Sequence, residues 1–378
     1  MRVWVWKFDR SMRKKPTYYG RRKKKFSRKL KISLYGAAVL VFALMCLVAS
    51  VGMGSAVKNR TEIFISTGSS YKAVQDSLRQ SGNVKMLNFN ILSRAKSYPE
   101  RVLPGRYVLQ RGMTARQVVE KLRRGHQDQV KVTFNKVRTV AQLAGVISKQ
   151  IEADSASLAT LLSDSAYLAS FQYPLSEDAS TDAPTQPFDT RTVLAVFIPN
   201  TYYFYWNTDA EGFFRRMYGE QNKFWNDFRK GQAYAIKLNR VQVSTLASIV
   251  EEETLKTDER PDIASVYMNR LRKGMLLQAD PTVKYAVGDF ALRRILKEHL
   301  QADSPYNTYK NKGLPPGPIC TPSVSSLDAV LQNKPTNYLY FCARADFCGY
   351  HSFAADYAHH RANARAYQKA LTERGITR

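Results

Sequence analysis

The feature that most constrains this chain of 378 residues is a run of 26 residues without a charge, Ile32 to Val57. About 20 apolar residues in a helix are enough to cross the hydrocarbon core of a bilayer. The 31 residues before the run hold 14 Lys and Arg and a single acid, Asp9. Because positive charge stays on the cytoplasmic side, the pattern predicts a cytoplasmic tail (1–31), a single transmembrane helix (32–57) and an extracytoplasmic remainder.

A cleaved signal peptide is the alternative interpretation, since Gly54-Ser55-Ala56 is a small-residue stretch of the kind found at cleavage sites. The apolar run exceeds the usual signal core of about 7–15 residues, and the basic segment before it is also long. We therefore favour an uncleaved anchor in the lipid of the cytoplasmic (inner) membrane, with the rest of the chain on its periplasmic or extracytoplasmic side.

The formal net charge of +27 raises the alternative of a nucleic-acid-binding protein. The tail alone contributes +13, which suits attraction to anionic lipid headgroups. The remaining +14 suits an anionic polymer such as a cell wall. The sequence has no aromatic-rich nucleic-acid motif and no cysteine pattern typical of a metal site. We therefore expect no nucleic-acid partner, no metal and no cofactor.

Beyond the run, about 320 residues are long enough for two domains. Hydrophobic patterns and capping residues predict a small α+β module over 58–128. Its order of strand, helix, helix, strand resembles a LysM module, although any small α+β spacer would show the same order. The predicted elements are a strand at 62–66, helices at 70–78 and 86–95, a strand at 106–109 and a helix from Thr114 to Gly125.

The rest of the chain, 129–378, is expected to form a mixed α+β domain. A segment rich in Pro, Ser, Thr and Asp, 173–190, is predicted to be a mobile loop. The other predicted elements are a strand at 129–134, helices at 140–151, 208–229 (opened by a capping box from Thr208 to Glu211) and 243–254, and a helix that begins near Pro261 and ends at Gly274.

Three consecutive glutamates, 251–253, follow an apolar helical segment. The apolar stripe through Leu246 and Val250 continues at Glu253, because residues three and four apart share a helix face. The other two glutamates point to other faces. A carboxyl in an apolar setting has a raised pKa and can stay protonated near neutrality, as a general acid requires. The alternative is a helix that ends in a solvated acidic run.

Several dense motifs lie C-terminal to these glutamates. Each motif alone is explained equally well by a turn, a packed strand or a rigid loop. In chain order they are Asn269-Arg270-Leu271, Leu277-Gln278-Ala279-Asp280-Pro281-Thr282, Ser304-Pro305-Tyr306-Asn307-Thr308-Tyr309, Gly313-Leu314-Pro315-Pro316-Gly317-Pro318 and His351-Ser352-Phe353.

In this order and spacing the motifs resemble the YceG-like family of endolytic murein transglycosylases, over about residues 190–368 and more weakly from 60. The resemblance places Glu253 as the second Glu of a Glu-x-Glu-Thr motif, with Glu251 first and Thr254 last. Asn200 departs from the family's more usual Pro-Asp-Thr, so an electrostatic role at that position is in doubt.

The resemblance implies a membrane-anchored lyase that cleaves the β-1,4 bond between N-acetylmuramic acid (MurNAc) and N-acetylglucosamine (GlcNAc) in nascent glycan strands. Glu253 would protonate the glycosidic oxygen and then, as a base, accept the proton of the C6 hydroxyl. The product would carry a 1,6-anhydro-MurNAc end, so no second carboxylate nucleophile is needed. The implied partners are peptidoglycan strands and peptidoglycan synthases, and the implied role is to terminate glycan elongation. A wall-binding protein without catalysis is the main alternative.

The same resemblance suggests which groups contact the saccharide, because amide, hydroxyl and phenol groups suit sugar hydroxyls and acetamides. Arg260 and Arg270 are expected to pair with nearby acids, and His351 and His360 to pack or donate hydrogen bonds. Whether Cys342 and Cys348 form a disulfide is left open. The expected saccharide-binding residues are Gln278, Asp280, Thr282, Tyr306, Asn307, Thr308 and Tyr309.

A reporter enzyme fused after residue 58 tests the predicted anchor. We expect activity only with a reporter that works outside the cytoplasm, because the positive flank of 1–31 holds the N-terminus inside. The mature protein should also keep its original N-terminus. Detection of a new N-terminus near Ala56 would contradict the anchor and favour the signal peptide.

Overall fold

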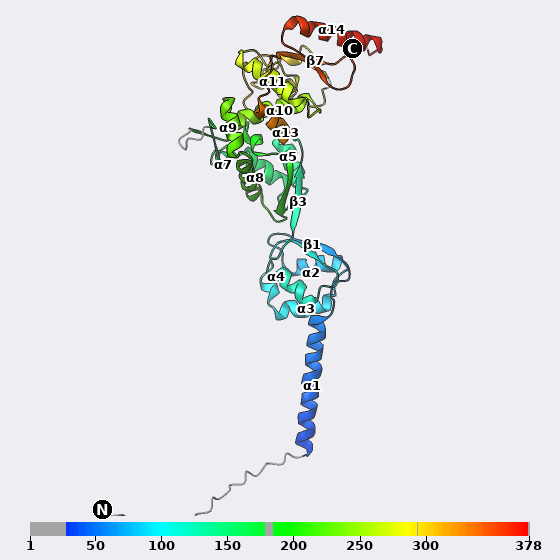
Figure 1. Ribbon diagram of the computed structural model, residues 1–378. Helices are drawn as coiled ribbons and strands as arrows, with labels where there is room; N and C mark the ends of the chain where they lie inside the picture. Colours follow the sequence, from blue (N-terminus) through cyan, green and yellow to red (C-terminus); the bar gives the residue numbers. More distant parts are fainter. Residues whose placement is uncertain (1–27, 178–183, 293, 377–378) are drawn as a thin grey trace, which may run out of the picture.

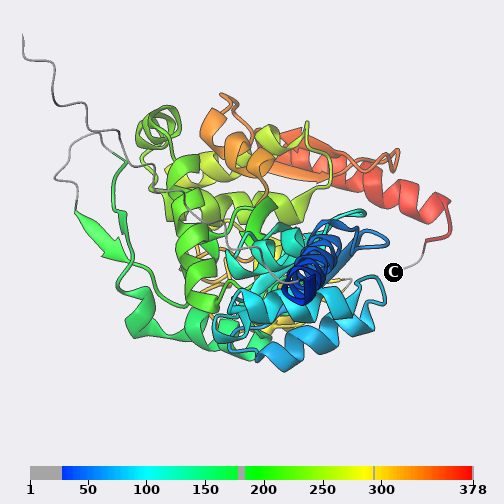
Figure 2. The same ribbon diagram turned by 90° about the horizontal axis from the view of Figure 1, so that it is seen from below.

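The structure, a computed structural model, describes residues 28–177, 184–292 and 294–376. The molecule is elongated (Figure 1). Helix α1 (Arg28–Met53) stands alone at one end, a small module follows, and two packed lobes make up the other half. The C-terminal helix α14 (Tyr357–Glu373) lies at the end remote from α1 and along the outer edge in the view from below (Figure 2).

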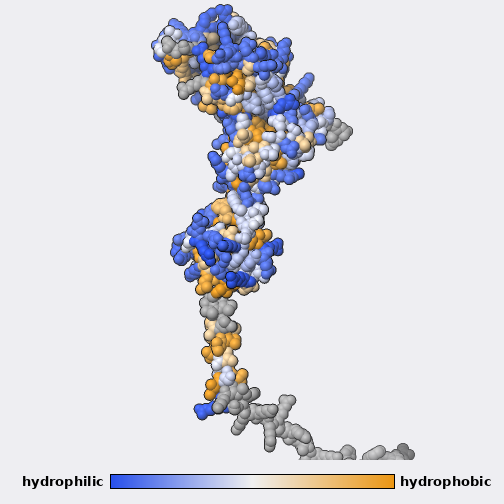
Figure 3. Space-filling view, turned by 180° about the vertical axis from the view of Figure 1, so that it is seen from behind, coloured by the Kyte–Doolittle hydropathy of each residue, from blue (hydrophilic) through white to orange (hydrophobic). Residues whose placement is uncertain are grey.

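Helix α1 covers most of the charge-free run, and hydrophobic residues lie along its surface (Figure 3). Leu40 and Phe42 are among its exposed apolar side chains. In the described part of the chain, no helix combines the length and the hydropathy that are required of a membrane-spanning helix. Most of the predicted basic tail lies outside the described residues.

The module after α1 has the predicted order of strand, helix, helix, strand. Strands β1 and β2 pair antiparallel, with Ile63 opposite Tyr107, and both side chains are buried in the module's own core. Thr114 caps the last helix in a capping box with Gln117, as its sequence predicts. The elements are β1 (Thr61–Ile65), α2 (Tyr71–Gln80), α3 (Met86–Ala95), η1 (Tyr98–Glu100), β2 (Gly105–Leu109) and α4 (Ala115–Arg123).

The first lobe contains the pair of antiparallel strands β3 and β6, whose inner side chains, Val132, Phe134 and Phe204, are buried against helices. Its core is rich in aromatic rings. The Glu152 carboxylate joins the lobe to the module, because it accepts hydrogen bonds from the backbone N–H (2.6 Å) and hydroxyl (2.7 Å) of Thr67. The elements are β3 (Gln129–Phe134), α5 (Val140–Ile147), α6 (Ser155–Ser163), α7 (Ser165–Leu168), β4 (Gln172–Pro174), β5 (Thr185–Pro187), η2 (Val193–Val196), β6 (Asn200–Tyr205) and α8 (Ala210–Phe224).

The second lobe is built around helix α10, which contacts α9, α11, α12 and α13. An Asn239 cap with Gln242 begins α10, and almost every side chain from Arg240 to Val250 is buried. The helix is thus buried on all sides, whereas the single apolar stripe in its sequence predicts burial of one face. The elements are α9 (Asp227–Ala235), α10 (Arg240–Glu253), α11 (Arg260–Arg272), α12 (Asp280–Val287), η3 (His299–Gln301), α13 (Val324–Gln332), β7 (Tyr340–Ala343), β8 (His351–Ala354) and α14.

The segment 173–190 differs from the mobile loop that its composition predicts. Its ends pair as β4 and β5, and Tyr173 and Phe188 are buried with their rings in contact. Glu177 forms a buried ion pair with Arg240 at 2.8 Å, at the start of α10. Composition alone does not reveal these long-range partners. Residues 178–183 lie outside the described residues.

The predicted long helix over 208–229 is two helices. Asp209, and not Thr208, caps α8, since its carboxylate accepts the N–H of Gly212 at 2.8 Å, whereas the Thr208 hydroxyl donates to the carbonyl of Tyr205. Helix α8 ends at Phe224, and Asn226 caps the next helix, α9. Asn is among the residues preferred as N-caps, so Asn226 is the sequence signal for the start of a second helix.

Gly317, in the Pro-rich loop, is buried where the two lobes meet. A Cβ atom there would lie 2.0 Å from the backbone oxygen of Arg191. We expect Gly317→Ala to lower the free energy of unfolding by about 2 kcal/mol or more, because backbone must move to accommodate the methyl group. Gly231→Ala is the control, since that exposed site in α9 is open, and Ala should raise stability by up to about 1 kcal/mol. Urea unfolding measures both, and equal stability of the two variants would contradict the packing described.

Candidate active site

Glu253 is the last residue of α10, and its carboxylate accepts a hydrogen bond of 2.5 Å from the hydroxyl of Tyr267 on α11. Removal from water raises the pKa of Glu253 from its usual 4.5 to about 7. The Tyr267 hydrogen bond opposes the shift, while the negative charge of Asp280 adds to it. The residue as a whole is nevertheless only partly buried and lines an open pocket of about 390 Å³. It can therefore meet a ligand while still holding a proton near neutral pH.

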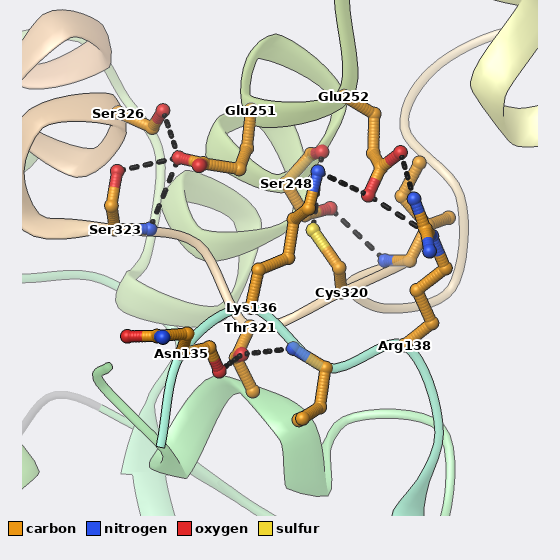
Figure 4. Close-up of polar contacts among 12 residues, drawn as sticks. Asn135, Lys136, Arg138, Ser248, Glu251, Glu252, Cys320, Thr321, Ser323 and Ser326 are labelled. Atoms are coloured by element: carbon orange, nitrogen blue, oxygen red, sulfur yellow. Dashed lines mark hydrogen bonds and ion pairs between the residues drawn. The ribbon is translucent and has the colours of Figure 1, made fainter. Parts of the chain in front are cut away.

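The neighbouring Glu252 is in the opposite electrostatic state. Arg138 donates two hydrogen bonds to it, at 3.1 and 2.8 Å, and the Lys136 ammonium lies 3.0 Å away (Figure 4). Burial disfavours the charge of Glu252, but these two cations outweigh burial and lower its pKa. Both cations lie on the segment that follows β3. Glu252 therefore joins the two lobes as an ionised residue.

Glu251 is held by a third set of partners, on and before α13. The backbone N–H and hydroxyl of Ser323 donate at 3.2 and 2.5 Å, and the Ser326 hydroxyl donates at 2.7 Å (Figure 4). Arg260 forms an ion pair with it at 3.2 Å, as the sequence predicts for that arginine. Neither Glu251 nor Glu252 belongs to a solvated acidic run. Both are held by hydrogen bonds and ion pairs to side chains of the protein, as structural carboxylates are.

Two of the residues predicted to contact saccharide, Asp280 and Tyr309, are close enough to Glu253 to interact with it electrostatically. The Tyr309 hydroxyl donates to Asp280 at 2.6 Å, and the negative charge of Asp280 helps to raise the pKa of Glu253. Asp280 is exposed in the first turn of α12 and does not cap that helix with its side chain. Gln278 is exposed with a positive φ of 51°, an unusual conformation for a residue other than Gly.

The other four residues predicted to contact saccharide are buried. Asn307 donates to two carbonyls at 2.9 Å each, and Thr308 and Thr282 share a hydrogen bond of 2.8 Å between their hydroxyls. Tyr306 packs against Tyr285 with ring centroids 4.6 Å apart. Their polar atoms are satisfied by the chain itself. We therefore assign them to positioning: they hold the loop of Tyr309 against the start of α12.

Some site residues were not identified from the sequence. Tyr267 reads as one more apolar position of α11, and only its hydroxyl within an apolar stripe hints at a buried polar partner. Glu259, buried, accepts hydrogen bonds from the Thr254 hydroxyl (3.2 Å) and from the backbone of His351 (2.6 Å), and its other contact is the His351 ring (2.8 Å). This set ties β8 to the end of α10, so His351 has the hydrogen-bonding role expected of it.

Three further expectations are settled by local contacts. Arg270 donates to the carbonyls of Leu277 and Leu339, both at 2.7 Å, so its predicted pairing with an acid is wrong. The His360 ring stacks on Tyr340, consistent with a packing role. Cys342 and Cys348 are both free.

The site offers proton transfer from and to one carboxyl. Among the described residues, no group of three or more His, Cys, Asp or Glu side chains is arranged to hold a metal ion. The positive charge of Lys284 acts on Glu253 and favours its ionised form. Donors and acceptors around the carboxyl thus tune its pKa in both directions.

A family model, curated proteins and a solved structure that are similar to this chain all point to the same family. The model of the YceG-like family matches residues 63–366. A Bacillus subtilis protein named endolytic murein transglycosylase is 31% identical over 295 residues, covering 76% of this chain and 80% of that protein. A Streptococcus pneumoniae protein of the same name is 29% identical, and this chain spans only about half (54%) of its length. The crystal structure of a YceG-like protein from Listeria monocytogenes matches with a TM-score of 0.53 and 28% identity, over 80% of this chain and 98% of that one.

The pKa shifts of adjacent carboxyls predict opposite effects on stability. Above pH 7 the Glu253 carboxyl is ionised in both the folded and the unfolded protein, but its charge is unfavourable only in the folded protein, where it is buried. Glu253→Gln should therefore raise the unfolding temperature at pH 8. At pH 4 both states are protonated, and the difference should vanish. Glu252→Gln should lower the unfolding temperature at pH 8, because it leaves Arg138 and Lys136 unpaired, and the loss should shrink as the pH falls. Thermal unfolding at the two pH values distinguishes the pair, and a common sign would contradict the assignments.

Proposed function

Because this chain belongs to the YceG-like family, we propose that it is an endolytic murein transglycosylase, a lyase that cuts peptidoglycan strands between MurNAc and GlcNAc. The observation that carries the proposal is the position of Glu253, which lines an open pocket while Tyr267 holds its carboxyl by a hydrogen bond and burial raises its pKa to about 7. The printed names of the Bacillus and Streptococcus relatives support the same activity.

In the proposed reaction the carboxyl of Glu253 transfers its proton to the glycosidic oxygen as the bond from that oxygen to C1 of MurNAc breaks. The C6 hydroxyl of the same MurNAc then forms a bond to C1, and its proton returns to Glu253. No water is consumed, and the carboxyl is regenerated. The Tyr267 hydroxyl favours the carboxylate that exists between the two transfers. A pKa near the working pH suits a group that must both donate and accept.

The surrounding residues have supporting roles in this proposal. Asp280, which is exposed and accepts the Tyr309 hydroxyl, would orient the sugar together with Tyr309 through hydroxyl contacts. Gln278, also exposed, lies two residues before Asp280 in the chain. Glu251 and Glu252 hold the end of α10 to both lobes, so their removal should act on folding before it acts on chemistry.

We also propose that the enzyme acts outside the cytoplasm, anchored by residues 32–57, and that the module over 58–128 is LysM-like and contacts glycan. The charge-free run with its basic flank supports the anchor, and the order of the module's elements supports the second part. A role in terminating the glycan strands that peptidoglycan synthases make would follow from this location.

Glu253→Gln tests the assignment directly. Gln keeps the shape but cannot donate and recover a proton, and a positioned acid–base group contributes about 10²–10⁴-fold to rate. We expect cleavage of purified peptidoglycan to fall at least 100-fold in a variant that remains folded. Wild-type activity should decline above about pH 7, as Glu253 loses its proton.

Mass spectrometry of the wild-type products tests the mechanism. They should end in 1,6-anhydro-MurNAc, lighter than a reducing end by one water. Reducing ends would refute the lytic mechanism, and near-normal activity in folded Glu253→Gln would refute the site.

A further inference from the structure

The pocket that opens beside Glu253 is larger and more varied in character than a sugar ring needs. Its volume is about 390 Å³, and one of its walls is Glu253 and Thr254 themselves. The other walls come from segments distant in the sequence: the turn between β7 and β8, and α14. The remaining lining residues used below are Leu255, Lys256, Arg344, Phe347, Tyr350 and Tyr367.

Two cations face this pocket. Lys256 lies with its ammonium 4.9 Å from the centre of the Tyr350 ring, and among the described residues no ion pair joins it to a carboxylate. Arg344 is exposed and is bound at 2.8 Å by the equally exposed Asp346. Asp258 faces the same corner but accepts the Tyr350 hydroxyl at 3.0 Å. Lys256 is therefore a cation held in place by a ring, with its charge available to a ligand.

Apolar surface lies next to these charges. Leu255 is 89% exposed, an unusual setting for a leucine two residues after the helix of the acid. The rings of Phe347 and Tyr367 pack at a tilt with centroids 5.5 Å apart and add an aromatic wall. Neutral sugar hydroxyls need no cation, whereas an anionic ligand with small apolar groups would use both surfaces.

The turn that carries this wall is shaped to lie against Lys256. Phe347 and Gly349 both have positive φ, of 61° and 81°. A Cβ on Gly349 would come within 3.4 Å of the side chain of Lys256. That distance is ordinary van der Waals contact, so the turn lies against the lysine stem, and the positive φ of Gly349 is what favours glycine there.

We propose that this pocket binds the peptide stem of the MurNAc residue that is cleaved. The inference rests on the proposed function, because it concerns the substrate of the same carboxyl. The stem leaves the sugar from O3 through a lactyl group, so it starts within one ring's width of the C1 bond that Glu253 protonates. It carries alanine methyl groups and free carboxylates, which match Leu255, the two rings and the two cations.

The test compares two substrates. One is uncrosslinked glycan with its stems, and the other is the same glycan after an amidase has removed them, which leaves a free lactyl carboxylate. For the wild type we expect kcat/KM to be higher on the stem-bearing strands. Lys256→Met and Arg344→Met should lower that preference about tenfold, through KM on the stem-bearing strands, as loss of one charge-assisted contact does.

The control variant is Lys369→Met, which removes a positive charge from α14 at a side chain that is 79% exposed. It should leave the preference unchanged. Lys256→Arg should restore most of the preference, and thermal unfolding should confirm that each variant folds.

The possible results separate the two proposals. Equal wild-type use of both substrates, or variants that lose activity on both alike, would overturn the stem pocket and leave the transglycosylase intact. A loss confined to the amidase-treated glycan would overturn it in favour of the lactyl carboxylate. Failure of the wild type to cut either substrate would overturn the proposed function and this inference with it.

Discussion

Three carboxylates in succession at the C-terminal end of a buried helix are the constraint on which this structure depends. The end of a helix carries partial negative charge, so all three are placed where ionisation is least favourable. Two of them are neutralised from outside the helix: Glu252 by Arg138 and Lys136, and Glu251 by Arg260 and the hydroxyls before and on α13. Only Glu253 is left with a phenol as its direct partner. A raised pKa is the physical consequence, and it leaves one carboxyl of the three able to hold a proton near neutral pH.

The two satisfied carboxylates also explain how the lobes meet. Arg138 lies 114 residues before Glu252 in the chain, and Ser323 lies 72 residues after Glu251. The end of α10 is therefore fixed from the first lobe on one side and from α13 on the other. At its opposite end, the buried pair of Glu177 and Arg240 fixes the start of the same helix. Moving the lobes apart would break these pairs and leave buried charges unpaired, which is costly. The pairs therefore restrain the lobes relative to Glu253 and would hold its carboxyl in place during the proposed reaction.

The sequence predicts the features of this structure that depend on neighbouring residues, and it predicts few of those that depend on residues distant in the chain. The Thr114 cap and the apolar stripe toward Glu253 lie within a few residues of what they determine, so the helix after Thr114 and the acid could be found. The Asn239 cap was not identified, and the predicted helix therefore begins at 243, whereas α10 begins at Arg240. Tyr267 could not be found, because its hydroxyl is hidden in an apolar pattern. The motif around Asn307 points to the right loop, yet the motif does not say that Asn307 and Thr308 are buried and that only Tyr309 reaches the site. The ends of 173–190 are ordered by pairing with each other as β4 and β5, and by the ion pair of Glu177 with Arg240, 63 residues away, and composition reports neither.

The proposed activity depends on the protonation of one carboxyl, that of Glu253, and NMR can measure this protonation. Glutamate labelled with ¹³C at the carboxyl would be followed from pH 4 to 9, and the signal absent from Glu253→Gln would identify the residue. We predict a titration midpoint near 7 for Glu253, with Glu252 titrating below its usual 4.5. A Glu253 midpoint at about 4.5 would mean that the carboxyl is ionised at neutral pH. In that case Glu253 could not be the acid that starts the reaction, and the central claim would be contradicted.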